Sequence, residues 1–177
     1  MSEPVAVDVS VEAPEWGEGS EEGDSWNDLV ETWVRAALCD LILPEGAEVS
    51  VVLADDARVA ELNGQWRNRP GSTNVLSFAA NDGEPDPARW QPLLGDIVVA
   101  HGVAVREARE QAKRLSHHVA HLVIHGALHL VGLDHLDAGD AEAMEQRERR
   151  ILASLGIADP YAAMGEPLQA ATMEKTP

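Results

Sequence analysis

Two histidines four residues apart, followed by a glycine and a third histidine, constrain this chain more than any other feature. They lie in the segment HGALHLVGLDH at residues 125–135. A four-residue spacing stacks side chains on one face of a helix, so His125 and His129 are within reach of one ion. Gly132 allows a left-handed turn that ends the helix, and the chain can then bring His135 to the same point.

This arrangement predicts a metal site. Three neutral imidazoles that leave coordination positions open for water are typical of a catalytic zinc site. We therefore expect His125, His129 and His135 to bind one zinc ion, while nickel, copper and iron also accept imidazole ligands. The spacing equals that of the metzincin proteases, in which a glutamate after the first histidine is the general base. Gly126 holds that position here, so the pattern favours a metal and disfavours peptide hydrolysis.

Neighbouring residues are candidates for supporting parts of this site. His121 lies one helical turn before His125 on the same face, where it either contacts a ligand ring or lines the cleft. Asp134 either orients a ligand ring or caps the turn. His117 and His118 begin the predicted helix, and we expect both to be exposed to solvent.

The charge of the chain limits its partners. The chain has 31 acidic residues against 13 lysines and arginines, a formal net charge of −18. This is not the basic footprint of a nucleic-acid binder or of a protein on an anionic membrane. Ten acidic residues and no basic residue precede Arg35. The remainder is only mildly acidic and can still present a local basic cleft.

The compartment is also constrained. The single cysteine, Cys39, excludes an internal disulfide and favours a reducing cytoplasm. Residues 1–15 lack the basic and apolar parts of a signal peptide. No run of about 18 apolar residues is present, so we expect no membrane span.

Hydrophobic periodicity predicts an α/β (α+β) fold: one mixed four-stranded sheet with helices packed on it, in the order βαβαββααα. The predicted strands are residues 5–12, 48–53, 74–79 and 94–100, and the predicted helices are 26–43, 55–66, 103–114, 116–131 and 141–155. Ser25 is the expected N-cap of the first helix. We expect a single domain at residues 1–158 with a flexible acidic loop at 17–25, and a weakly ordered tail at 159–177.

Two motifs resemble those of the YbeY family of bacterial rRNA maturation factors. The histidine segment is similar to the family signature HGxLHLxGYDH, with Leu133 in place of the usual tyrosine. Residues 62–78 are similar to the pattern LNxxYRxxxxPTNVLSF, with Trp66 for the tyrosine and Ser72 for the proline. The LGDI of residues 94–97 also resembles the family.

The resemblance implies a metal-dependent, single-strand-specific endoribonuclease acting in 16S rRNA 3′-end maturation and ribosome quality control. It implies a zincin-like α/β fold and one metal ion held by the three histidines. Its partners would be ribosomal RNA and the small ribosomal subunit with its proteins, and we expect neither a membrane nor DNA as a partner. Two other hypotheses stay open: a different zinc hydrolase such as a peptidase or amidase, and a non-catalytic ribosome-assembly factor with a structural metal.

Arg67 is the candidate catalytic residue outside the histidine segment. A guanidinium matches phosphate oxygens bidentately, and Arg67 matches the arginine of the family motif. The alternative is a solvated loop arginine, or one paired with a neighbour such as Asp56. Ser77 either faces the cleft or packs. The general base is open between an acidified water, His121 and an RNA 2′-hydroxyl, and we expect weak, ribosome-dependent affinity for free RNA.

Overall fold

The computed structural model describes residues 4–133 and 138–162. The strands are β1 (Ala6–Val11), β2 (Glu48–Ala54), β3 (Val75–Ala79) and β4 (Leu93–Ala100), and the helices are α1 (Trp26–Leu38), α2 (Asp56–Arg67), α3 (His101–Glu110), α4 (Leu115–Leu130) and α5 (Ala138–Ser154). Short 3-10 helices at Pro14–Trp16 and Pro87–Arg89 begin at prolines. The predicted order βαβαββααα and the α/β fold are confirmed.

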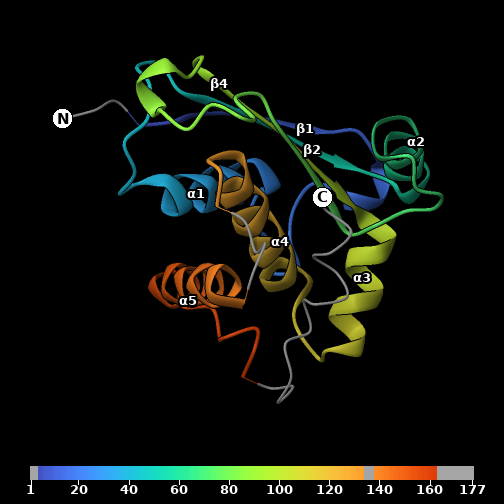
Figure 1. Ribbon diagram of the computed structural model, residues 1–177. Coiled ribbons are helices and arrows are strands. Elements are labelled where there is room, and N and C mark those ends of the chain that lie inside the picture. Colours follow the sequence, from blue (N-terminus) through green and yellow to red (C-terminus); the bar gives the residue numbers. More distant parts are fainter. Residues whose placement is uncertain (1–3, 134–137, 163–177) are drawn as a thin grey trace.

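The strands form one mixed sheet in the order β1-β2-β4-β3 (Figure 1). β1, β2 and β4 run parallel, and β3 runs antiparallel to β4 at the edge. The register places Ile97 of β4 between Val51 of β2 and Ser77 of β3. Parallel neighbours require a crossover connection, and α1 supplies it between β1 and β2.

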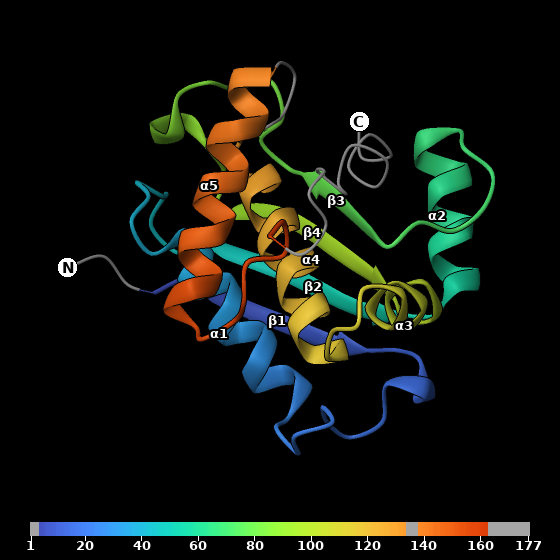
Figure 2. The same ribbon diagram turned by 90° about the horizontal axis from the view of Figure 1, so that it is seen from below.

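The helices form unequal layers on the two faces of the sheet (Figures 1 and 2). α1 and α4 cover one face, and α5 lies beyond α4, away from the strands. The larger core lies between the sheet and these helices, and includes Val30, Ile97 and Ile124. A smaller core on the other face packs Val59 of α2 against Leu76 and other strand residues. α4 is therefore the central helix of the larger core.

Several helix boundaries differ from the prediction. Ser25 caps α1 as expected, since its side chain accepts a hydrogen bond from the Asp28 N–H, but α1 ends at Leu38 rather than at residue 43. Leu41 and Leu43 still pack against the core from the following turn, so apolar spacing continues where the helix does not. α3 begins at His101, directly after β4 and two residues before the predicted start.

The acidic loop at residues 17–25, predicted to be flexible, makes specific contacts with α4. The Glu21 carboxylate accepts hydrogen bonds from the Ser116 N–H, at 3.0 Å, and from its hydroxyl, at 3.1 Å. Glu22 pairs with Arg114 at 2.6 Å. Arg114, the N-cap of α4, provides no side-chain cap, so Glu21 satisfies a backbone donor that the helix itself leaves unpaired.

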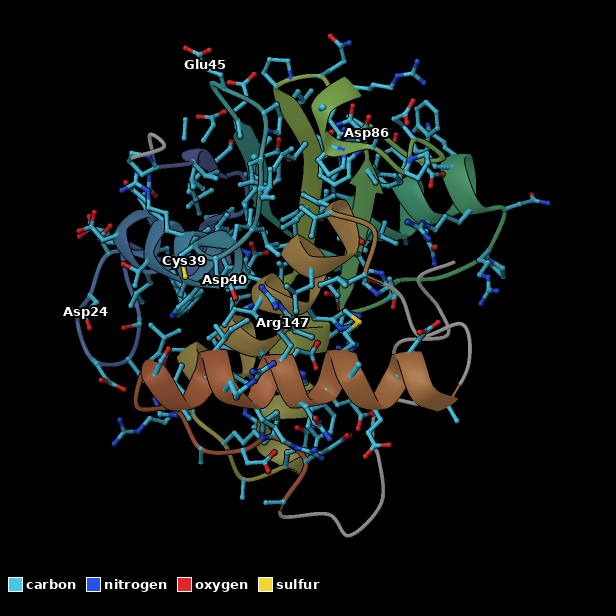
Figure 3. The ribbon with its side chains drawn as sticks, turned by 60° about the vertical axis from the view of Figure 1, so that its left-hand side comes forward. Asp24, Cys39, Asp40, Glu45, Asp86 and Arg147 are labelled. Carbon is cyan, nitrogen blue, oxygen red and sulfur yellow. The ribbon has the colours of Figure 1, made fainter. Side chains whose placement is uncertain are left out.

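α5 is joined to the rest of the molecule by an ion pair as well as by packing. Figure 3 shows Arg147 of α5 and Asp40, which follows the end of α1, and these two side chains form a salt bridge. Met144 and Leu152 on the same helix are buried. Within residues 4–133 and 138–162, no helix combines the length and the apolar content needed to cross a bilayer.

Candidate metal centre

α4 brings two of the predicted ligands together. The Nε2 atoms of His125 and His129 lie 2.9 Å apart, with His125 buried and His129 half-buried. Two imidazole nitrogens bound to one tetrahedral ion, at bonds of about 2.0–2.1 Å, lie about 3.3 Å apart. The pair is thus close to the arrangement of two ligands of a single ion, and imidazole nitrogens are donors that zinc accepts.

The third predicted ligand cannot be compared with the structure. His135 and the neighbouring Asp134 lie outside the described residues. Among the residues that are described, no three histidine, cysteine, aspartate or glutamate side chains gather closely enough to hold an ion. The three-histidine ligand set therefore stays a prediction, with two of its members shown to converge.

Glu148 of α5 contacts the opposite side of the His125 ring. Its Oε1 lies 2.6 Å from His125 Nδ1, and the side chain is fully buried. An ionised carboxylate only accepts hydrogen bonds, so His125 donates from Nδ1 and a neutral ring keeps its lone pair on Nε2, towards His129. A carboxylate in this position fixes the ring orientation and raises the basicity of a metal-binding histidine.

The surroundings of Glu148 keep it ionised. Burial alone would raise the pKa of this carboxyl, but the electrostatic interaction and the hydrogen bonds with His125 and His121 lower it below its ordinary value. The Tyr161 hydroxyl donates to Oε2 of Glu148. Burial, followed by the Glu148 charge, raises the pKa of that hydroxyl above its usual range, so it remains a donor.

His121 contacts the same two side chains, Glu148 and Tyr161. Its Nε2 lies 3.1 Å from the Tyr161 hydroxyl and 3.5 Å from Oε2 of Glu148. Its ring meets the Tyr161 ring edge-on, with centroids 5.4 Å apart. The structure therefore places His121 against the carboxylate that supports His125.

Gly126 faces the sheet. A Cβ at this position would lie 3.1 Å from Cγ2 of Ile97 and 3.3 Å from its Cγ1, so glycine lets α4 lie directly on β4. A larger side chain at this position would press on Ile97, which would have to shift. Ser77, paired with Ile97 in the register, is buried; it alternates along β3 with Val75 of the larger core, which places it on the face that α4 covers.

Arg67 lies at the end of α2 and covers the outer edge of β3. Asn74 and Ala100 form a hydrogen-bonded pair across β3 and β4, since the Asn74 carbonyl accepts from the Ala100 N–H. Such pairs alternate along an antiparallel ladder, so the backbone N–H and carbonyl of Ser77, three residues later, are directed away from β4. Arg67 Nη2 donates to the Ser77 carbonyl at 2.5 Å, and its Cζ lies 5.2 Å from the centre of the Phe78 ring. Burial, and then the charge of Arg69, lower the pKa of Arg67. Arg67 is thus half-buried at a strand edge rather than solvated in a loop.

Sequence reasoning missed two residues behind His125, namely Glu148 and Tyr161. The helix predicted at residues 141–155 was given no part in the site, yet the buried positions of α5 recur every four residues as Met144, Glu148 and Leu152. A carboxylate on that apolar stripe was an available signal. Tyr161 was assigned to a weakly ordered tail, but it is only 6% exposed. No local pattern marks Tyr161 as buried, since its hydroxyl and ring contact side chains of α4 and α5.

His118 also differs from its prediction. It was expected to be exposed, but it is buried and its Nε2 lies 3.0 Å from Oε1 of Glu107 on α3. Asn74 Nδ2 donates to the same carboxylate oxygen at 3.0 Å. The Glu107 carboxylate therefore joins α3, α4 and the start of β3, and His118 has a structural setting of its own, away from the His125–His129 pair.

Several known proteins with similar sequences carry the same name. A family model described as Endoribonuclease YbeY matches residues 17–156. The protein named Endoribonuclease YbeY from Azorhizobium caulinodans is 48% identical over 153 residues, which cover 82% of this chain and 95% of the relative. The protein of that name from Methylocella silvestris is 46% identical over 160 residues, covering 88% and 85%. The solution structure of TM1509 from Thermotoga maritima is 25% identical, with a TM-score of 0.49 and coverage of 85% and 91%.

Proposed function

The chain belongs to the YbeY family of endoribonucleases, and from this premise we propose that it hydrolyses single-stranded RNA with a divalent metal ion held by His125, His129 and His135. Family membership makes it a hydrolytic endonuclease that acts on RNA. The observation that carries the metal centre is the convergence of His125 and His129, with Nε2 atoms 2.9 Å apart and Glu148 behind His125. Zinc is the proposed metal because it is the usual ion of open three-imidazole sites.

The residues of the chain divide the work of phosphodiester hydrolysis. When bound, such an ion polarises a phosphoryl oxygen and acidifies a water molecule. Glu148 keeps the proton of His125 on Nδ1, and so keeps Nε2 available as a donor atom. Arg67 contacts the phosphate oxygens and stabilises the charge that develops on them. Its bond to the Ser77 carbonyl and its position over Phe78 fix the guanidinium before RNA arrives.

Proton transfer is assigned by elimination among the described groups near the His125–His129 pair. Gly126 provides no carboxylate, and the space next to it is filled by Ile97. His121 Nε2 is directed at Tyr161 and Glu148, which supports a structural role for this ring. We therefore assign the proton transfers to water and to the RNA 2′-hydroxyl rather than to a side-chain base.

The proposed substrate is ribosomal RNA, near the 3′ end of 16S rRNA in the small ribosomal subunit. The family resemblance supports this choice, and the charge distribution is consistent with it. Residues 67–72 carry two arginines and no acid in a chain of net charge −18, so free RNA has little positive surface to bind. Association with the ribosome would supply the affinity that this small patch does not. A cytoplasmic location, suggested by the single cysteine, stays a prediction.

A peptidase or amidase is disfavoured because Gly126 carries no general base at the position where the metzincin proteases have one, and a larger side chain there would press on Ile97. The direct test compares cleavage of a labelled single-stranded RNA, the same RNA in a duplex, and casein by the purified protein. We expect cleavage of the single strand alone. Hydrolysis of casein with intact RNA would overturn the proposal in favour of a peptidase, and no hydrolysis of any substrate would favour a non-catalytic assembly factor.

A further inference from the structure

The segment that follows α5 supplies a side chain to the cluster behind His125. Tyr161 lies seven residues after the end of α5 at Ser154, and its hydroxyl donates to Oε2 of Glu148. We propose that Tyr161 is a positioning residue of the metal centre, acting through Glu148 on His125. This inference rests on the proposed metal site, and it places residues 159–161 within the functional domain.

The geometry explains how a hydroxyl can affect a ring that it does not contact. Glu148 uses Oε1 for His125 Nδ1, at 2.6 Å, and Oε2 for the Tyr161 hydroxyl. With this side chain fully buried, no bulk water replaces a lost partner. Without the hydroxyl, Oε2 keeps His121 Nε2 at 3.5 Å as its remaining described contact. The carboxylate is then free to rotate towards His121, and the orientation of His125 is less well fixed.

Separate contacts hold Tyr161 over Glu148. The Asp159 carboxylate accepts from the Tyr161 N–H at 2.8 Å and from Arg149 Nε at 3.2 Å. The Arg149 guanidinium lies 4.9 Å from the centre of the Tyr161 ring. Lys113 Nζ, from the turn after α3, donates to the Pro160 carbonyl at 3.4 Å. This turn of chain is therefore fastened to two elements, and the position of the hydroxyl is set by the fold.

The measurable consequence is a change in metal affinity. Partners that orient a metal-binding histidine typically change affinity by about 10- to 100-fold when they are altered. We expect Tyr161→Phe, which removes only the hydroxyl, to weaken metal binding about tenfold. Glu148→Gln should weaken it at least as much, because it alters the direct partner of His125. The double variant should resemble Glu148→Gln, since both changes act through one hydrogen-bonded chain.

The experiment titrates the metal-free full-length protein with Co²⁺ against a competing chelator, at a temperature where every variant is folded. The visible absorption of bound Co²⁺ reports ligand geometry independently of affinity. Glu142→Gln is the matched control, an exposed carboxylate on the same helix, and should bind as the wild type does. Asp159→Ala keeps the hydroxyl but loosens its support, so it should give a smaller loss in the same direction and carries the test if Tyr161→Phe does not fold.

The outcomes separate this inference from the proposed function. Weaker Co²⁺ binding and an altered spectrum in Tyr161→Phe would support the positioning role. Wild-type Co²⁺ affinity and spectrum in Tyr161→Phe, with only a lower melting temperature, would overturn the role and leave the metal centre intact. If Tyr161→Phe does not fold, the same result in Asp159→Ala would have the same meaning. Absence of Co²⁺ binding by the wild type would overturn the metal centre itself, and the inference with it.

Discussion

Oε1 of Glu148 lies 2.6 Å from Nδ1 of His125, which makes α5 a structural partner of α4, the helix that carries two of the proposed metal ligands. The two residues are 23 positions apart in the sequence, and their contact exists only when α5 has packed on α4. The donor geometry of His125 therefore depends on tertiary structure as well as on helical spacing. Because such a site is preformed only in the folded chain, metal binding should stabilise the fold.

His129→Ala tests the ligand pair. The half-buried ring lies at the end of α4, so we expect the variant to fold but to lose RNA cleavage and the rise in melting temperature that metal gives the wild type. His117→Ala, on the same helix but paired with Glu22, is the control and should retain both. Calorimetry with and without metal, beside an RNA cleavage assay, gives the measurement; wild-type values for His129→Ala would remove this residue from the site.

Arg67→Ala tests the phosphate contact. Loss of a charged donor to a developing oxyanion typically lowers kcat by about 100- to 1,000-fold, and we expect this loss without a change in metal content. Arg67→Lys should not restore the rate, because an ammonium cannot donate bidentately. Arg58→Ala, an exposed position on α2 paired with Glu61, is the matched control. Single-turnover cleavage rates decide the matter, and an Arg67→Ala rate within a few-fold of wild type would contradict the role.

Gly126→Glu tests whether this position can carry a base. The new side chain would be forced against Ile97, with a buried charge, so we expect a loss of about 3 kcal/mol or more in the free energy of unfolding and no peptidase activity. Gly64→Glu is the control, since Gly64 is exposed within α2 and its nearest non-local atom would lie 3.9 Å from the new Cβ. Denaturant unfolding compares the two. A stable Gly126→Glu protein that cleaves casein would revive the peptidase hypothesis.

Glu21→Ala tests the cap of α4 and its pH dependence. Burial alone would raise the pKa of Glu21, but its hydrogen bonds with Ser116 outweigh this and lower the pKa from 4.5. A lowered folded-state pKa contributes stability above the unfolded value, and that contribution is lost as pH falls below about 4.5. At neutral pH we expect Glu21→Ala to lose about 1 kcal/mol, as helix caps do.

The comparison for Glu21 is Glu18→Ala, an exposed carboxylate in the same loop. The difference in the free energy of unfolding between the two variants should shrink as pH is lowered from 7 towards 3. A difference that stays constant over this range would show that the Glu21 carboxylate does not act through its charge.

Local periodicity was sufficient to predict the order of elements and the facing histidines of α4. His125 and His129 share a face because they are one helical turn apart, which requires no knowledge of the rest of the fold. The same reasoning placed Ser25 correctly as a cap. Apolar spacing continues beyond the end of α1, at Leu41 and Leu43, and therefore predicted too long a helix. These two residues pack against the core from the segment after α1.

Residues whose roles depend on distant partners were missed. Glu148 was not singled out from the sequence, because its burial is favourable only with His125 opposite its carboxylate. Tyr161 is buried by contacts from α4 and α5, and Glu21 caps a helix that begins 94 positions later, at Leu115. These pairings are set by how the helices pack on the sheet, and the local sequence does not name the partner of any of the three residues.

Metal dependence of RNA cleavage tests the central claim most directly. The purified protein should contain about one equivalent of a divalent ion, lose single-stranded RNA cleavage when a chelator removes it, and regain the rate when one equivalent of zinc is returned. Cleavage at an unchanged rate by protein shown to be metal-free would contradict the account.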